Sequence, residues 1–451
     1  MLNRIRVLLC GALLLAGCVP AWAQGTGSDR PFKGALFGGN RPVNSAQSLD
    51  MSLSLLEAYD DDVFADVGST VSSPTSRGVG GYFTALQSGF EYKHSGQRLS
   101  VGASGASVFR YYPELRKVRS VAHTMGAGFS TRLARRTTLL LNQTVAYSPS
   151  YLFGLFPGIA PVEPGDAMTS APDFAANNAN NANNIESYRY GTTATLTQGF
   201  SPRMTLAITG DSQYTNYLHE TAVQTDVQSS GIGGEVSYRR SKNTAVRIGY
   251  RYRDGNLGNA AVAGSTNEHA LNVGATYSRL VSASRRVFLA FNVGPSAINV
   301  LENDDGTPAL ARLYRAAGDA MMGYQFGRAW QARGTYRRGL ELVAGLTRPV
   351  FTDAFTAMVD GLLTSRLDLQ MSAGYSSGQS AVARTAPRFD TYTGDVRLRY
   401  ALAQSSAVHI EYLYYFYDFS GYMQPRPGTP SRLERNGVRA GLTLQVPALR
   451  R

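Results

Sequence analysis

The sequence is almost without cysteine. Cys10 and Cys18 are the only two in 451 residues, and both lie near the N-terminus. The rest of the chain therefore excludes a disulfide framework, a thiolate metal site and a cysteine nucleophile. The five histidines are scattered, and none has a second histidine at metal-ligand spacing. With no phosphate-binding glycine loop either, we expect neither a metal nor a cofactor.

Charged residues and long apolar runs are also scarce. Only 17% of the residues are charged, whereas glycine (47 residues) and tyrosine (26 residues) are abundant. Beyond the N-terminal segment there is no apolar run of about 20 residues, the length of a transmembrane helix. No helical periodicity is sustained, which is unusual for a soluble multi-domain protein of this length.

The N-terminus has the features of a targeting segment. Arg4 and Arg6 form a basic region, an apolar stretch follows, and Ala21-Trp22-Ala23 is a small-x-small cleavage site. We therefore predict a signal peptide over residues 1–23 and a periplasmic leader over residues 24–46. The alternative is a lipobox at residues 15–18, which would make Cys18 the lipidated first residue of the mature protein.

A short polar turn recurs about every 40 residues and joins two stretches of alternating apolar and polar residues. Short turns at one end and longer connections at the other are typical of a transmembrane β-barrel, whose strands satisfy all backbone groups among themselves. The predicted turns are at residues 94–97, 134–136, 201–203, 241–243, 282–285, 327–328, 365–366 and 404–406.

The alternation has a period of two, which places one set of side chains on lipid and the other in the lumen. Val246, Ile248 and Tyr250, for example, alternate with arginine and glycine. The sequence therefore predicts an all-β fold, an antiparallel up-and-down barrel over residues 47–447 with a tail at 448–451. We expect 18 strands, with 16 as the alternative, short periplasmic turns and long extracellular loops. The protein is then integral to the outer membrane of a Gram-negative bacterium.

The pattern of charge carries the main functional signal. An arginine on the lipid face at mid-depth would cost about 2–4 kcal/mol, so these residues are expected to face the lumen. Because arginines outnumber acids there, we predict a preference for anions. The alternative is that the arginines pair with lumen acids and brace the wall. The predicted lumen residues are Arg132, Arg189, Arg239, Arg247, Arg251, Arg253, Arg333, Arg337, Arg397, Arg399, Arg439, Glu235, Asp319, Asp360, Asp368 and Asp395.

Neither catalysis nor nucleic-acid binding is indicated. His219 and His269 fall near the extracellular side beside Glu220 and Glu268, but each is expected to be a solvated loop residue. The formal charge of +12 lies along barrel strands and not in a tail or an exposed helix. We therefore expect neither an enzyme nor a nucleic-acid partner.

The first predicted strand ends in Tyr59-Asp60-Asp61-Asp62, followed by Val-Phe. This string resembles the opening of β-barrel porins of Gram-negative bacteria, a family often associated with exopolysaccharide loci. Asp62 stands where the family usually has asparagine. The last strand also resembles the signal recognised by the barrel-assembly machinery, although the usual terminal aromatic residue is missing. The residues of that signal are Arg439, Gly441, Leu444 and Val446.

The resemblance implies a passive channel for small hydrophilic solutes, which the lumen arginines would bias towards anions. The alternatives are an exit duct for an anionic exopolysaccharide and a non-conducting adhesion barrel. The expected partners are outer-membrane lipid and lipopolysaccharide, the assembly machinery, and the solute or polysaccharide; the sequence does not indicate an oligomeric state. In many porins the third loop, here residues 149–186, folds into the lumen, and an ordinary surface loop is the alternative.

Overall fold

The computed structural model describes residues 46–61, 80–113, 118–148, 187–217, 226–257, 264–282, 284–304, 307–327, 329–342, 349–381, 388–403, 405–418 and 432–450. The predicted signal peptide, Cys18, the leader up to residue 45 and the connection at 149–186 lie outside these residues. In the described part, no helix is long and apolar enough to span a membrane.

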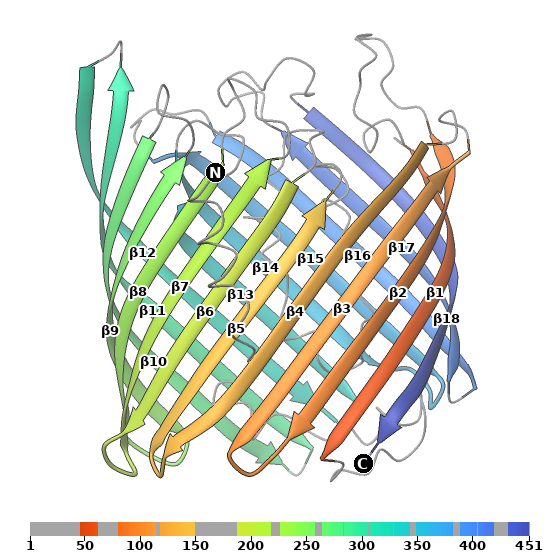
Figure 1. Cartoon of the computed structure of the whole chain (residues 1–451), viewed down its shortest axis with the longest axis horizontal. Helices are drawn as coiled ribbons and strands as arrows, with labels where there is room; N and C mark the ends of the chain where they lie inside the picture. The colour runs from red at the N-terminus through yellow and green to blue at the C-terminus, as the bar shows by residue number, and fades with distance from the viewer. Residues whose placement is uncertain are drawn as a thin grey trace, which may run out of the picture.

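Eighteen antiparallel strands form one sheet that closes on itself (Figure 1), which confirms the predicted fold class and strand count. The strands are β1 (Gln47–Asp60), β2 (Gly81–Ser95), β3 (Leu99–Tyr112), β4 (Val118–Ala134), β5 (Thr137–Ser148), β6 (Ser187–Gly199), β7 (Met204–Tyr217), β8 (Val227–Arg239), β9 (Thr244–Leu257), β10 (Gly264–Ser282), β11 (Arg285–Asp304), β12 (Thr307–Phe326), β13 (Trp330–Glu341), β14 (Val350–Leu362), β15 (Leu367–Ser380), β16 (Arg388–Ala403), β17 (Ser406–Asp418) and β18 (Arg432–Arg450).

Each predicted short turn joins two consecutive strands at one end of the barrel. In Figure 1 these turns lie at the lower end, where β18 also finishes. Several are tight hydrogen-bonded reversals: the amide of Ser241, for example, donates to the carbonyl of Thr244 (3.1 Å), and Ser241 Oγ accepts from the amide of Thr244 (3.1 Å). A side chain that caps its own turn in this way explains why serine recurs there.

Two predicted boundaries differ from the structure. β18 continues to Arg450, through most of the segment predicted as a tail, because Leu449 and Arg450 pair with Leu49 and Ser48 across the seam of the barrel. The connection between β11 and β12 is not a long loop, since only residues 305 and 306 separate the two strands. Both strands are 20 residues long and form an extended hairpin instead.

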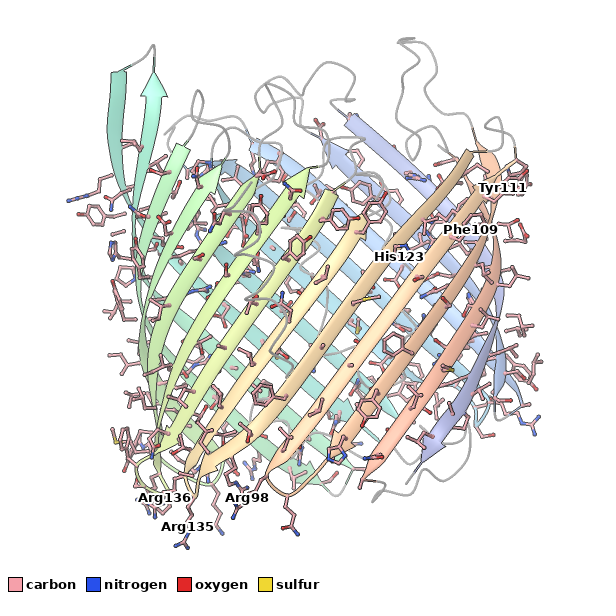
Figure 2. The ribbon with its side chains drawn as sticks, in the orientation of Figure 1. Arg98, Phe109, Tyr111, His123, Arg135 and Arg136 are labelled. Atoms are coloured by element: carbon pink, nitrogen blue, oxygen red, sulfur yellow. The ribbon has the colours of Figure 1, made fainter. Side chains whose placement is uncertain are left out.

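The outer face of the barrel is apolar. Ile248, Val273 and Val293 are cross-strand neighbours on β9, β10 and β11, and each is about half exposed. Aromatic side chains, among them Phe200 and Tyr238, are exposed beside the short turns, where rings with a polar edge favour the membrane boundary. In Figure 2, Arg98, Arg135 and Arg136 project from the short-turn end, whereas Phe109 and Tyr111 lie towards the other end.

A closed antiparallel barrel with an even number of strands and an apolar outer face is the architecture of bacterial outer-membrane proteins. Every strand pairs with a neighbour on each side, so the closed sheet has no edge strand facing lipid. The protein is therefore an integral outer-membrane protein of the Gram-negative type. This agrees with the resemblance to Gram-negative porins found in the sequence.

Substituting an outward residue tests the assignment of the two faces. We expect Val273→Arg, at the middle of β10, to lower the free energy of unfolding in lipid by about 2–4 kcal/mol, because a cation would then face hydrocarbon. Asn272→Arg, one residue away on the inner face, is the matched control and should have a smaller effect. Urea titrations of the refolded barrels in vesicles measure both changes, and equal effects would contradict the assignment.

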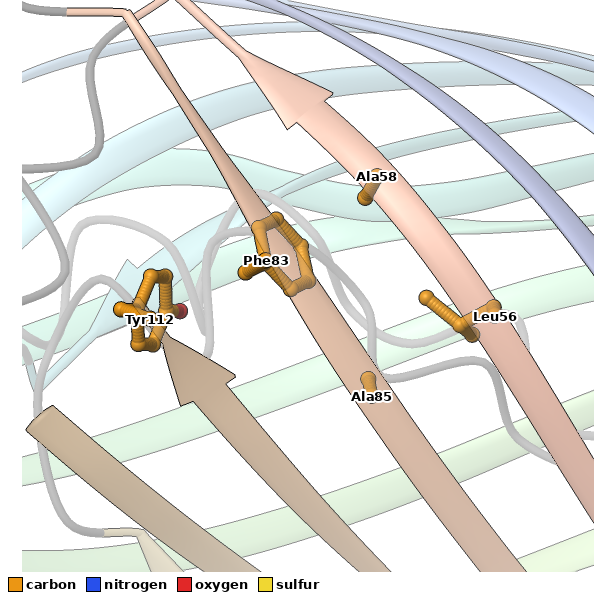
Figure 3. Close-up of a cluster of buried hydrophobic side chains, with 5 residues drawn as sticks. All are labelled: Leu56, Ala58, Phe83, Ala85 and Tyr112. Carbon is orange, nitrogen blue, oxygen red and sulfur yellow. The ribbon is translucent and has the colours of Figure 1, made fainter. Parts of the chain in front are cut away.

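The inner face also contains buried apolar side chains. Leu56, Ala58, Phe83, Ala85 and Tyr112 form a cluster on β1, β2 and β3 (Figure 3). The guanidinium of Arg110 lies 5.5 Å from the centroid of the Phe83 ring. The inner face is therefore covered at this end of β1–β3, whereas Ser104, nearer the short turns on β3, is exposed.

The first and last strands are held together by a buried polar contact at the end away from the short turns. Arg435 Nε donates to both carboxylate oxygens of Asp60 (2.7 and 2.9 Å), and both residues are almost completely buried. Next to them, the Asn436 side-chain and backbone nitrogens each donate to Asp61 at 2.8 Å. The acidic pair that ends the first strand thus closes the barrel against β18.

Candidate functional site

The inner face is the candidate functional surface. On β9, Arg247 and Arg251 alternate with the outward Ile248 and Tyr250, and the antiparallel register carries this parity from strand to strand. All the predicted lumen residues lie on this inner face by register, from Arg132 on β4 to Arg439 on β18. Whether they line an open pore stays a prediction.

On one side of the barrel these charges are buried and paired. Arg397, Arg399 and Arg439 are 7%, 7% and 4% exposed. Arg399 contacts the carboxylate of Asp368, and Arg439 Nη1 lies 3.9 Å from Glu411 Oε2. Arg397 instead donates to the side-chain oxygen of Gln370. We call the inner faces of β15–β18 the paired wall. A charge that is both buried and neutralised by its neighbour contributes little to the field in an aqueous passage, so this wall is suited to bracing the barrel.

On another side the charges are open to the lumen. Arg251 Nη2 donates to both oxygens of Asp211 (2.9 and 3.0 Å), yet 45% of the Arg251 side chain remains exposed. Arg247 Nε lies 3.9 Å from Glu235 Oε2, and 31% of the Glu235 side chain is exposed. We call the inner faces of β7–β9 the open wall. Part of the Arg251 side chain on this wall therefore remains accessible from the lumen.

Several predicted residues have other contacts. Gln331 Nε2 donates to Asp360 Oδ1 (2.9 Å), Ser372 contacts Asp395, and Arg337 Nη2 lies 2.9 Å from Glu341 Oε1. Arg132 and Arg239 are exposed near short turns, at the opposite end of the barrel from Arg253. The structure therefore distributes the predicted set over the whole inner face and does not gather it into one site.

Several inner-face groups were missed from the sequence. Asp211 and Glu411 follow the same alternation as the predicted acids, so their positions contained the necessary signal. Arg435, fully buried at the seam, has no such regular neighbours, and its partner Asp60 was noted only as part of a family-like string. With these acids included, the inner face is closer to charge balance than the predicted set suggests.

The described residues contain no group of three or more His, Cys, Asp or Glu side chains able to hold a metal ion. His269 Nδ1 lies 2.7 Å from Tyr250 Oη on the outer face, and its ring packs against Tyr252. Glu268 points to the other face, where it accepts a hydrogen bond from Ser296 Oγ (2.6 Å). Both residues lie on β10, on opposite faces, so the prediction that His269 is a loop residue was wrong. His219 and Glu220 lie outside the described residues.

No family model matches the sequence, and no curated protein matches it. The chain is similar to the solved structure of OpdQ from Pseudomonas aeruginosa, with 11% identity, 89% of this chain and 98% of that chain covered, and a TM-score of 0.41. OccAB3 from Acinetobacter baumannii has 10% identity, coverage of 89% and 99%, and a TM-score of 0.39. OccK9 (OpdG) from Pseudomonas aeruginosa has 12% identity, coverage of 89% and 98%, and a TM-score of 0.43.

Proposed function

We propose that the protein is a porin-like channel through which small hydrophilic solutes diffuse passively across the outer membrane. The observation that carries the proposal is the closed 18-stranded barrel with an apolar outer face and a polar inner face. Barrels of 16–18 strands are wide enough to leave an aqueous channel, whereas barrels of about 8 strands are filled by their own side chains. Passage of this kind needs no covalent chemistry.

We further propose that the channel prefers anions. The open wall supports this preference, because the exposed guanidinium of Arg251 is accessible from the lumen while its partner Asp211 is mostly covered. A charge at a low-dielectric wall concentrates ions of the opposite sign near it. The buried arginines of the paired wall are expected to contribute little.

Osmotic swelling of liposomes that contain the refolded barrel tests both proposals. We expect a small neutral sugar to enter, gluconate to enter faster than a cation of similar size, and dextran to be excluded. Liposomes without protein give the baseline. Absence of swelling by a folded barrel in small neutral solutes would contradict the channel proposal, whereas faster entry of the cation would contradict the anion preference alone.

The alternation of the last strand supports the proposed assembly signal. Leu444 and Val446 face outwards, and Arg439 is buried on the inner face. The polysaccharide duct and the adhesion barrel are not favoured by any particular feature of the described residues. An export duct would be expected to bind an acidic polysaccharide and to admit small solutes poorly.

A further inference from the structure

The end of β13 leaves the barrel wall. β13 pairs with β12 only as far as Arg338 opposite Gly318, whereas β12 continues against β11 to Thr307. Beyond Arg338, the described chain no longer pairs with the backbone of the neighbouring strand β12. We define the inner arm as residues 340–342 and 349–352, which are the end of β13, the start of β14 and the described residues next to them.

The inner arm packs on the inner faces of β12 and of β11, which is one strand further round the sheet. Leu340 and Phe351 share an apolar cluster with Ile298 and Val300 of β11, and all four are at most 3% exposed. Inner-face residues at the mouth of a water-filled barrel would be wetted unless something covered them. Their burial shows that the arm covers this part of the wall.

Polar contacts fix the arm further round the barrel, on β8 and β9. Arg253 Nη1 donates to the carbonyl of Leu340 (2.9 Å), while its Nε donates to Ser229 Oγ (2.9 Å). An arginine thus links the backbone of the arm to a wall four strands away in the sheet. Because a guanidinium donates in a fixed fork, it holds the carbonyl in one position.

Gly255 on β9 is the residue against which Leu342, directly after the end of β13, packs; we call Gly255 the seat of the arm. A Cβ at this position would lie 1.9 Å from Leu342 Cδ1 and 3.2 Å from its Cγ, far inside van der Waals contact. Gly255 faces the lumen opposite Ser229 and Thr266 in the register. A side chain at position 255 would therefore force the Leu342 side chain to move from this position.

We propose that the inner arm is a constriction of the channel, which narrows its extracellular mouth on the β8–β12 side, with Arg253 as its anchor and Gly255 as its seat. The inference deepens the proposed function and depends on it, because it names what limits the width of the passage. Solutes would then pass between the arm and the opposite wall. The arm is a different segment from the third loop, residues 149–186, which the family resemblance implied as the constriction. The third loop lies outside the described residues.

Conductance measurements on matched variants test the constriction. Gly255→Val displaces Leu342, and Arg253→Ala removes the anchor, so each should raise the unitary conductance, by roughly 1.5-fold or more, as the open cross-section grows. The matched control is Gly102→Val on β3, where the new Cβ would meet nothing nearer than 3.8 Å. Unchanged conductance in both arm variants would overturn the proposal, provided that the wild-type barrel conducts.

A disulfide trap locates the arm without relying on conductance. With Cys10 and Cys18 replaced by serine, the pair Gly255→Cys and Leu342→Cys should form a disulfide on mild oxidation and lose both free thiols. The pair Gly102→Cys and Leu342→Cys should keep its thiols. Free thiols in the first pair would overturn the position of the arm. The wild-type barrel could also fail to conduct while the variant with Gly255→Cys and Leu342→Cys still forms its disulfide. That result would confirm the position of the arm and overturn the proposed channel function, together with the role of the arm in conduction.

Discussion

Arg435→Met is expected to destabilise the barrel far more than the loss of an exposed ion pair would. The Arg435 side chain is 0% exposed, and its guanidinium donates hydrogen bonds to both carboxylate oxygens of Asp60 across the seam between β1 and β18. Removing one partner of a buried ion pair leaves an uncompensated charge and costs about 3–5 kcal/mol. The loss should appear as a lower urea midpoint and a lower temperature at which the compact band disappears in semi-native gel electrophoresis.

The double variant Asp60→Leu with Arg435→Met separates the effect of an orphaned charge from that of the missing contact. Because an apolar pair of similar volume often replaces a buried ion pair at little cost, the double variant should recover much of the stability. Arg251→Ala is the matched control: its ion pair with Asp211 is partly exposed, so the loss should be within about 1 kcal/mol. If Arg435→Met were no worse than this control, the seam would not depend on the pair.

Arg251→Glu is expected to produce the largest change in ion selectivity. The substitution puts a second carboxylate beside Asp211 on the open wall, so an exposed cation becomes an exposed anion. We expect the permeability ratio of chloride to potassium to fall by roughly twofold or more at low salt, and the change to shrink as salt screens the charge. Reversal potentials in a salt gradient measure the ratio directly.

Arg399→Gln, on the paired wall, gives the contrasting case. Arg399 is buried against Asp368, so its loss should lower stability while leaving the permeability ratio close to that of the wild type. The two variants therefore separate charges that act on solutes from charges that brace the wall. A large selectivity change in Arg399→Gln, with none in Arg251→Glu, would show that the assignment of the two walls is reversed.

The fold was predictable because its signals are local. A serine-rich turn and a period-two pattern, such as that from Val246 to Tyr252, depend only on residues close in sequence, and together they fix where each strand lies and which face is apolar. The same signals failed at the β11–β12 hairpin, where extended pairing took the place of a loop. There the backbone pairing of β11 with β12 continues to Asp304 and Thr307, over residues for which the sequence predicted a long loop.

The organisation of the lumen was not predictable in the same way. Parity places Arg251 and Arg399 on the same face, but it cannot tell that one is exposed and the other covered. That distinction depends on contacts between residues far apart in the chain, such as Arg253 with Leu340 and Arg435 with Asp60. Those contacts exist only after the barrel has closed and the inner arm has folded against the wall.

Single-channel recording of the refolded full-length barrel in planar bilayers tests the central claim most directly. Folding is verified first on the same sample by its compact, heat-sensitive band in gel electrophoresis. The channel proposal predicts discrete, long-lived conductance steps, with a reversal potential on the anion-selective side in a chloride gradient. A correctly folded barrel that inserts and gives no conductance steps would contradict it.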